Sequence, residues 1–526
     1  MLSINLLALT LCAGTLVEPF RIAQAEPGHH QSYPCAAMAP DGHFAVAWVD
    51  SIASGDPLHP DDLELDLFVR FFNRDGNPMT DAYQIAKMAD TNWLHYPWLE
   101  MDTAGNAILL WVDRKTQSAE QPSYVRFQRF APDGSPACSA HTVVARVFLY
   151  KRSPIDLSLN NRGDFAVTWL EVIPPYWDLT SVWVQRFDLD GYPENRAFLT
   201  HDVPGGDYLL PFTFPRVALN DEGDLVVTWR DEFIPRDTVY RRFQVFDAAD
   251  EPILSWMPRG HLLDYGEWGR WAEPYWLDDE RFVAFWVKIL GGLWPYGIVG
   301  GVFTHRGLAR YPIRTVVVDE EAYMWTWSGS ERDFSVAFSS DERFAETHVR
   351  GYYHEDPWLV WYHGGGVIGE IRDNEPCRRT NLFEYTPPLG KDTAYSDFLC
   401  STTAVAACDD RIVWVYTRPN PDTILEAWAL ISDWDMGVGV VEQPIVEKPP
   451  NWEVITSIGP QIVLQYQDRP DGFRASIFDA SGRKVDEIHA TGASGMITWG
   501  RCYGPGVYFI VLQDSQAPAL KVVLVR

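Results

Sequence analysis

The amino-acid sequence predicts an all-β protein that is built mainly from one repeated unit. Three observations lead to this expectation. A polar turn that runs into an apolar strand ending in tryptophan recurs at nearly constant spacing. A second strand that ends in a tight turn follows each copy. The residues after a proline-containing linker, "EKPPN" at 447–451, have a different strand pattern.

The first signature of the repeat is clearest in "ALNDEGDLVVTW", which ends at Trp229. Leu225, Val227 and Trp229 fall on one face of a strand, and Val226 and Thr228 on the other, so that both faces suit burial. The five clearest copies end at Trp48, Trp111, Trp169, Trp229 and Trp286, spaced by 63, 58, 60 and 57 residues. A fixed period of this length indicates a repeated supersecondary unit.

The second signature is a strand that enters an Asp-Gly type turn, as in "VWVQRFDLDGYP", Val182–Pro193. One further strand on either side gives about four strands per unit. Four short strands in each repeat predict a β-propeller. Later copies are degenerate, with Phe338 and Tyr416 at the tryptophan position, and counting them gives about seven blades, although six or eight also fit.

The chain is expected to contain three segments. Residues 1–25 resemble a signal peptide, because an apolar run precedes "AQA" at 23–25, a small-x-small cleavage site. No Lys or Arg precedes Arg21, so the usual basic start is missing. Residues 26–447 form the propeller repeat domain, and residues 448–526 form a small β-sandwich of the immunoglobulin-like kind. No apolar run is long enough for a membrane span.

The bulk composition excludes some classes of partner. The 526 residues include 43 basic and 72 acidic side chains, which gives a net charge of −29. Such a surface repels phosphate backbones, so nucleic-acid binding is not expected. Acidic turns that contain Asn220, Asp221 and Asp224 could hold calcium, although these residues also form turns without a metal. No other cofactor is expected.

The C-terminal segment carries three ordered motifs: "FRASIFDASGRKV", "MITWGRCYGPGVYFIVL" and "LKVVLVR". It resembles the type A C-terminal sorting domain of type IX secretion. The family's motif residues correspond here to Gly482, Arg483, Gly506, Tyr508, Lys521 and Arg526. The chain departs from the family after Trp499, where Gly500 and Arg501 replace Asp-Gly. An unrelated immunoglobulin-like module is the alternative.

The resemblance implies export by the type IX secretion machinery to the outer cell surface or the medium. It also implies that the sorting domain is usually removed. The repeat region, over roughly the first 310 residues, is similar to repeats of large secreted bacterial proteins. That similarity carries no catalytic residues.

The most aromatic stretch is "WMPRGHLLDYGEWGRWAEPYW", Trp256–Trp276. We expect a long loop between two repeat units. Aromatic faces with interspersed carboxylates suit a sugar site, and the alternative is that these rings pack between blades. The candidate ligand-binding residues are Trp256, Tyr265, Trp268, Trp271 and Trp276.

The sequence therefore favours a non-enzymatic, secreted or cell-surface propeller that binds a glycan or a protein. No G-x-S-x-G, H-E-x-x-H or P-loop motif is present. The alternative is a secreted carbohydrate-active enzyme. It would need a pair of carboxylates near the propeller axis, for which Asp264, Glu267 and Glu273 are the candidates.

Overall fold

The computed structural model divides into two units, Met1–Gly439 and Val440–Arg526, and each is described by itself. The sequence-based boundary at 447/448 lies close to this division. The residues that the structure describes are 14–52, 65–88, 97–113, 123–137, 141–147, 155–173, 176–188, 190–194, 197–201, 215–233, 238–253, 261–267, 269–289, 296–305, 313–318, 323–324, 334–353, 359–380, 382–384, 386, 390–393, 403–420, 424–436, 452–456, 458–466, 473–479, 483–492, 494–501, 503–512 and 520–525.

The described strands of the first unit form seven antiparallel sheets. Five of these sheets consist of four consecutive strands. The first is β2 (His29–Met38), β3 (Phe44–Ile52), β4 (Leu65–Phe72) and β5 (Tyr83–Met88). The second is β6 (Trp98–Met101), β7 (Ala107–Asp113), β8 (Ser123–Phe130) and β9 (His141–Val147). The third is β10 (Ile155–Leu159), β11 (Phe165–Ile173), β12 (Tyr176–Phe187) and β13 (Phe198–His201).

The next two sheets repeat the same order. The fourth is β14 (Arg216–Leu219), β15 (Leu225–Phe233), β16 (Thr238–Phe246) and β17 (His261–Glu267). The fifth is β18 (Gly269–Trp276), β19 (Arg281–Ile289), β20 (Tyr296–Thr304) and β21 (Arg314–Val318).

The last two sheets depart from the simple order. The sixth contains β22 (Tyr323–Met324), β23 (Phe334–Phe338), β24 (Arg343–Tyr353), β25 (Leu359–Arg372), β26 (Glu375–Arg378), β27 (Phe383–Glu384) and β28 (Gly390–Thr393). The seventh contains β29 (Thr403–Cys408), β30 (Arg411–Pro419), β31 (Leu425–Ser432) and, at its outer edge, β1 (Thr15–Arg21).

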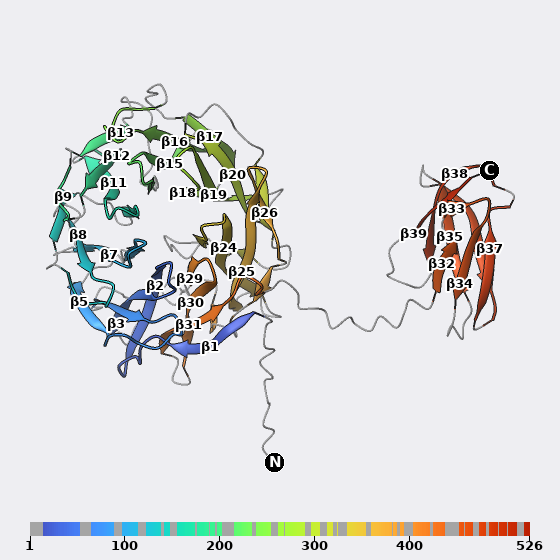
Figure 1. Cartoon of the computed structure of the whole chain (residues 1–526), viewed down its shortest axis with the longest axis horizontal. Coiled ribbons are helices and arrows are strands. Elements are labelled where there is room, and N and C mark those ends of the chain that lie inside the picture. Colours follow the sequence, from blue (N-terminus) through green and yellow to red (C-terminus); the bar gives the residue numbers. More distant parts are fainter. Residues whose placement is uncertain are drawn as a thin grey trace, which may run out of the picture. The chain divides into compact units, whose positions relative to one another are not determined.

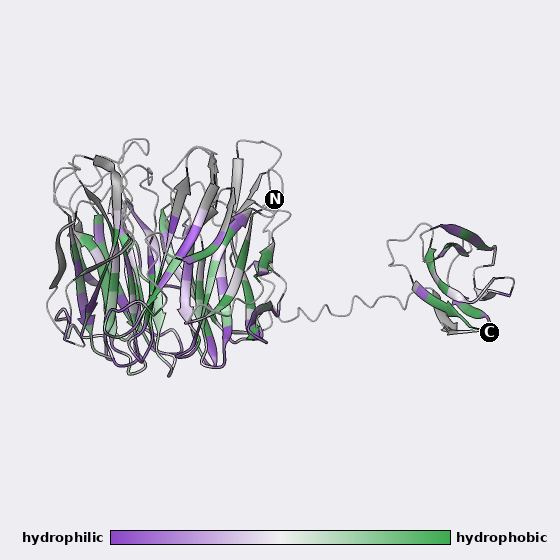
Figure 2. Ribbon diagram, turned by 90° about the horizontal axis from the view of Figure 1, so that it is seen from above, coloured by the Kyte–Doolittle hydropathy of each residue, from purple (hydrophilic) through white to green (hydrophobic). Residues whose placement is uncertain are grey.

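The seven sheets stand in a ring (Figure 1). The first strands of neighbouring sheets contact one another around the axis, as β2 does with β6 and β29, and β14 with β10 and β18. This arrangement is a β-propeller, as the repeat predicts. Apolar residues follow the strands, and hydrophilic residues gather at the turns at one end of the ring (Figure 2).

The repeated tryptophan lies on the second strand of its sheet, between neighbouring sheets. Trp48, Trp111, Trp169, Trp229 and Trp286 are all at most 3% exposed. Both faces of β15 are covered, because Val226, Val227 and Thr228 are also fully buried. The prediction of strands buried on both faces is confirmed at this element.

The polar turn before each second strand has one geometry. In the turn 160–164 the Asn160 side chain accepts hydrogen bonds from the backbone N–H groups of Arg162 and Asp164, both at 3.0 Å. Gly163 has a φ of 88°, a left-handed conformation that glycine adopts without strain. This is a three-residue hairpin loop with a bulge, and it connects strands of matching twist.

One sequence alignment is wrong. The segment "ERDFSVAF" was expected to place Phe338 at the position of the buried tryptophan. The structure places Phe338 at the end of β23, the innermost strand of the sixth sheet, and a turn at 339–343 follows it. Counted from the equivalent turns, His348 on β24 corresponds to Trp229 on β15.

The seventh sheet joins the two ends of the first unit. Strand β1 pairs with β31 and completes the four-stranded sheet. Its residues lie within the segment 1–25 that the sequence predicts as a signal peptide. Cleavage after Ala25 would therefore remove β1 from this sheet.

The second unit has two sheets with one apolar core. One sheet contains β32 (Trp452–Thr456), β34 (Ile462–Tyr466) and β37 (Gly495–Trp499). The other contains β33 (Ile458–Gly459), β35 (Phe473–Asp479), β36 (Lys484–Ala490), β38 (Gly506–Leu512) and β39 (Leu520–Leu524). Leu464 from the first sheet and Ile477 and Ile510 from the second are fully buried in that core.

Four of the six expected sorting residues lie in the described part of this unit. Arg483 pairs with Asp479 at 3.1 Å. Gly506 begins β38, the Tyr508 hydroxyl donates to the carbonyl of Gly504 at 2.9 Å, and Lys521 lies on β39. Gly482 and Arg526 lie outside the described residues. No helix among the described residues is long and apolar enough to cross a membrane.

Candidate functional site

A cavity of about 330 Å³ lies on the axis of the ring. The innermost strand of every sheet contributes to its wall: β2, β6, β10, β14, β18, β23 and β29. These strands bring together residues that are far apart in the sequence, because each sheet supplies three to five of them. The axial cavity is therefore the place where one ligand could touch all seven sheets.

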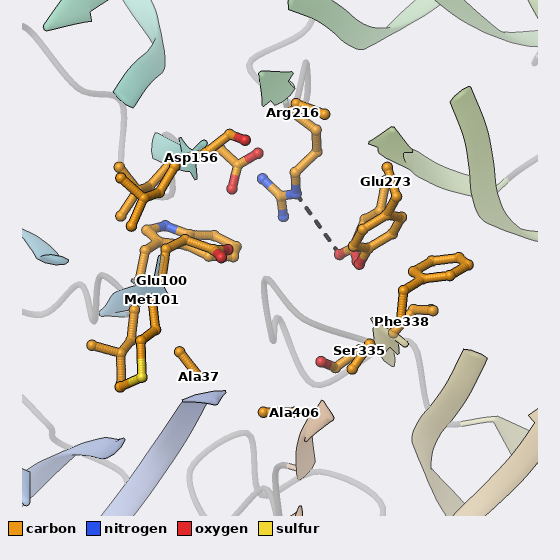
Figure 3. A pocket seen from close by; sticks show the side chains of 18 of the residues that line it. Ala37, Glu100, Met101, Asp156, Arg216, Glu273, Ser335, Phe338 and Ala406 are labelled. Carbon is orange, nitrogen blue, oxygen red and sulfur yellow. Dashed lines mark hydrogen bonds and ion pairs between the residues drawn. The ribbon is translucent and has the colours of Figure 1, made fainter. Parts of the chain in front are cut away.

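One wall of the cavity is charged. It contains Glu100 from β6, Asp156 from β10, Arg216 from β14 and Glu273 from β18 (Figure 3). The guanidinium of Arg216 lies between Asp156 and Glu273, and its Nε is 3.8 Å from Glu273 Oε1. The same guanidinium lies over the ring of Trp98, with 4.8 Å between its Cζ and the ring centroid. This ring and the carboxylates hold the cation in place.

Asp156 also connects two sheets. Its Oδ2 accepts a hydrogen bond of 2.8 Å from the backbone N–H of Val217 on the next first strand. Two residues further along β10, the hydroxyl oxygen of Ser158 accepts a hydrogen bond of 2.9 Å from the backbone N–H of Leu219. The position of the Asp156 carboxylate is therefore fixed by the backbone of the neighbouring strand.

Tyr275 holds the carboxylate of Glu273. Its hydroxyl donates a hydrogen bond of 2.9 Å to Glu273 Oε2. Burial raises the pKa of Tyr275 well above its ordinary value, and the negative charges of Glu273, Glu100 and Asp156 raise it further. The phenol therefore remains protonated and keeps donating to the carboxylate.

The opposite wall is mostly apolar. It contains Ala37, Met101, Ser335, Phe338 and Ala406, which surround the lower half of the view in Figure 3. The Phe338 ring lies 5.2 Å from that of Tyr275, centroid to centroid. The cavity therefore offers hydrogen-bonding groups on one side and small or apolar groups on the other.

A second cavity of about 330 Å³ lies nearer the hairpin turns that join the first and second strands. Met38, Met101, Trp276, Phe338 and Ala407 line both cavities. These five residues lie between the two cavities, which adjoin along the axis from the charged wall to the turns. The two cavities together are called the axial channel below.

The five aromatic residues predicted to bind a ligand lie in different places. Trp276 lies on β18 and lines both cavities, and its Nε1 donates to the carbonyl of Ala218 at 2.9 Å. Tyr265 and Trp271 lie on β17 and β18, although the structure does not describe their side chains. Trp256 and Trp268 lie outside the described residues.

The expectation of a long loop in this stretch is wrong. Most of it forms β17, which pairs with β16, and β18, which pairs with β19. Residues 261–276 therefore supply the last strand of one sheet and the first strand of the next. Backbone pairing and burial of Leu263 and Ala272 stabilise these strands.

Of the predicted carboxylates, Glu273 lies in the axial cavity. Asp264 does not, because it lies between the fourth and fifth sheets. It accepts hydrogen bonds from Trp286 Nε1 at 3.0 Å and from Lys288 Nζ at 2.9 Å, and lies 3.8 Å from Arg241 Nη1. Glu267 lies on β17, and the structure does not describe its side chain.

Sequence reasoning missed Asp156, Arg216 and Glu100. A signal for two of them was present. The residue 13 positions before the repeated tryptophan is charged in three successive repeats, as Asp156, Arg216 and Glu273. A charge inside an otherwise apolar innermost strand indicates a residue that faces the axis.

The Asn and Asp side chains of the turns accept hydrogen bonds from the backbone. Asn220 Oδ1 accepts from the N–H of Asp224 at 2.7 Å, and Asp188 Oδ1 accepts from the N–H groups of Asp190 and Tyr192. Among the described residues, no group of three or more His, Cys, Asp or Glu side chains could hold a metal ion.

Comparison with known proteins gives structural likenesses only. No family model and no curated protein sequence matches the chain. A protein of unknown function from Dyadobacter fermentans matches with 10% identity and a TM-score of 0.39, over 80% of this chain and 98% of that one. The GH93 α-L-arabinofuranosidase of Fusarium graminearum, in complex with arabinobiose, matches with 10% identity and a TM-score of 0.39, over 81% and 99%. The phage phi92 endosialidase matches with 7% identity and a TM-score of 0.44, over 80% and 69%.

Proposed function

We propose that the protein binds a glycan in its axial channel. The main observation behind this proposal is that Asp156, Arg216 and Glu273 meet on one wall of the axial cavity, opposite a mostly apolar wall. A sugar presents hydroxyl groups at its edge and C–H groups on its face. The charged wall offers acceptors and a donor for the hydroxyls, and Trp276 and Phe338 offer apolar surface for the face.

A second candidate is hydrolysis of that glycan, with Asp156 and Glu273 as the pair of carboxyl groups. Glycoside hydrolysis commonly uses two such groups on either side of the scissile bond. The observation that favours it is the hydrogen bond from Tyr275 to Glu273, because it holds that carboxylate as an acceptor. In this mechanism the Glu273 carboxylate attacks the anomeric carbon, or takes a proton from a water that attacks it, as the bond to the leaving oxygen breaks. Asp156 acts in its protonated form and gives its proton to that leaving oxygen.

The test is a glycan array with the full chain, beside Glu273→Gln and Trp276→Ala. Each variant should weaken binding at least about tenfold, because it removes a charge-assisted acceptor or an apolar contact. Glu280→Gln is the matched control, because Glu280 is exposed in the turn between β18 and β19, and this variant should bind like the unchanged protein. Unchanged binding by both channel variants would place the ligand elsewhere.

Hydrolysis is then tested on every glycan that binds, by measuring new reducing ends. Asp156→Asn and Glu273→Gln should each slow release by about 10² or more if the two groups act as acid and base. Binding without release would leave recognition as the function. An array with no bound glycan at all would contradict both candidates and direct the search to protein ligands.

Three finer proposals concern the chain as a whole. The seven sheets are the blades of one closed propeller, and the second unit is an immunoglobulin-like sorting domain. The protein is exported by type IX secretion and is secreted or held at the outer cell surface. The motif residues Arg483, Gly506, Tyr508 and Lys521 support this proposal. Expression in a bacterium with and without that machinery, followed by surface labelling, tests it, since equal labelling would contradict it.

A further inference from the structure

The outer edge of β31 is filled by a strand from the opposite end of the chain. Thr15 pairs with Ser432, and Arg21 pairs with Trp428. The pairing has irregular register between Thr15 and Phe20, so β1 lies on the edge with bulges. The contacts of this segment are more extensive than backbone pairing alone.

Apolar contacts hold the segment 14–22 between the first and seventh sheets. Ile22, the residue after β1, is fully buried in the core that the first and seventh sheets share. The ring of Phe20 lies 5.9 Å from that of Phe72 on β4. A Cβ at Gly76 would lie 2.9 Å from the Phe20 ring, so the first sheet's turn leaves room for the phenyl group only because residue 76 is glycine.

The polar contacts fix its register. The N–H of Ile22 donates to the carbonyl of Ala427 at 2.9 Å, and Arg70 Nη1 donates to the carbonyl of Ile22 at 2.8 Å. Arg21 Nε lies 3.1 Å from Glu426 Oε2, whose side chain is 4% exposed. At the other end of the strand, the N–H of Asp433 donates to the carbonyl of Gly14 at 2.8 Å.

We infer that the outer edge of β31 is a strand-binding site whose occupant is the segment 14–22 of this chain. The segment therefore stays with the folded protein and does not leave with a signal peptide cut after Ala25. Its loss would expose an unpaired sheet edge and the apolar contacts of Ile22, and would take the Arg21 cation from a buried Glu426. Any export processing consistent with the fold then cuts upstream of Gly14, or leaves the cut segment bound.

In the experiment, a protease cuts the full chain once, between β1 and the rest of the propeller. Gln24, Glu26, Pro27 and Gly28 are exposed, so a protease recognition sequence inserted after Ala25 can be reached in the folded protein. After cleavage, the segment should co-elute with the propeller in gel filtration and separate from it only in denaturant. Release of the segment from a propeller that keeps its melting temperature would overturn the inference.

Two substitutions on the segment provide a matched pair. Ile22→Asp puts a charge into a fully buried position and should abolish co-elution after the nick. Leu16→Asp changes a side chain that is 48% exposed on the same strand and should leave co-elution intact. Equal retention of both nicked segments would contradict the site.

Two further measurements cover a failure of Ile22→Asp to fold. Arg21→Glu reverses the charge beside Glu426 with little change in apolar contact, and the nicked form should lose its segment more readily than the unchanged protein. The mass of the protein purified from its native source should include Thr15–Arg21. A mature chain that begins at Glu26 with no bound segment would overturn the inference.

Discussion

Asp264 shows how a carboxylate in an aromatic stretch can serve packing rather than ligand binding. It lies beside Arg241, which is fully buried. Burial lowers the pKa of Arg241 to about 10, and the Asp264 charge acts in the opposite direction. The carboxylate therefore keeps a cation charged between two sheets.

Asp264→Asn should destabilise the protein by about 3 kcal/mol, because it leaves a buried guanidinium without its compensating charge. Urea unfolding of the full chain measures this cost. Glu375→Gln, which breaks the exposed pair with Arg314, is the control and should cost much less. Unchanged stability with lost glycan binding would instead give Asp264 a part in the site.

The sixth sheet replaces an apolar pair by an ionisable one. Glu346 and His348 occupy the places of Val227 and Trp229 when counted from the equivalent turns, and both are fully buried. His348 Nδ1 lies 3.0 Å from Glu346 Oε1, and His348 Nε2 has no hydrogen-bond partner among the described residues. Such a pair contributes less to stability than the side chains that it replaces.

The unchanged protein should lose stability as the pH rises, because the buried Glu346 carboxyl group ionises. The Glu346→Gln variant should lose less stability over the same pH range. Burial raises the pKa of Glu346, the nearby Glu273 raises it further, and His348 opposes this. A carboxyl group whose pKa is higher in the folded than in the unfolded state stabilises the fold below its unfolded pKa. That stability is lost as the pH rises through the folded pKa.

The measurement compares urea unfolding of this variant and the unchanged protein at pH 4 and at pH 8. The variant should gain stability relative to the unchanged protein between these values. Glu280→Gln, an exposed control, should show no such difference. A difference that shrinks as the pH rises would contradict the assignment.

At the scale of single elements, the turns with a left-handed glycine make the most specific demand on the sequence. Gly134 has a φ of 80°, and a Cβ there would lie 2.7 Å from Thr80 Cγ2 and 2.8 Å from Phe71 Cγ. Gly28 has a φ of 85°, and a Cβ there would meet nothing within 4 Å. Substituting Gly28 therefore tests backbone strain alone, and substituting Gly134 tests the same strain together with steric crowding.

Gly28→Ala should cost about 1 kcal/mol from the left-handed backbone alone. Gly134→Ala should cost about 2–4 kcal/mol, because overpacking against Phe71 adds to the same strain. Equilibrium unfolding of both variants of the full chain tests this difference. Equal costs would show that the turn at 131–135 moves aside without penalty.

The repeat made these elements predictable, because each buried tryptophan marks the second strand and a glycine such as Gly163 or Gly223 marks the turn before it. The stretch between Leu263 and Glu273 was not predictable in this way. Its two strands belong to different sheets and are separated by a single residue, so no turn residues mark the boundary. The charged wall was also missed, because a lone charge on each of several strands becomes a cluster only when the ring closes.

At the scale of the whole molecule, the charge of −29 restricts the partners. We expect no binding to DNA or RNA, because phosphates and the acidic surface repel each other. A gel-shift experiment at low salt, with protein at about 10 µM, should show no complex, since non-specific binders are retained at that concentration. A complex that dissolves on adding salt would reveal a basic patch within the acidic surface.

The closure of the ring by β1 also sets the order of events during synthesis. Thr15 leaves the ribosome first, and its partner Ser432 follows more than 400 residues later. At about 5–20 residues per second, the first strand waits roughly 20 to 80 s for its edge. During this time Phe20 and Ile22 lack their contacts with the seventh sheet, and a contact between such distant residues is slow to form. The unpaired edge of β31 and the apolar side chains of this segment therefore stay open to wrong partners until the two ends of the first unit meet.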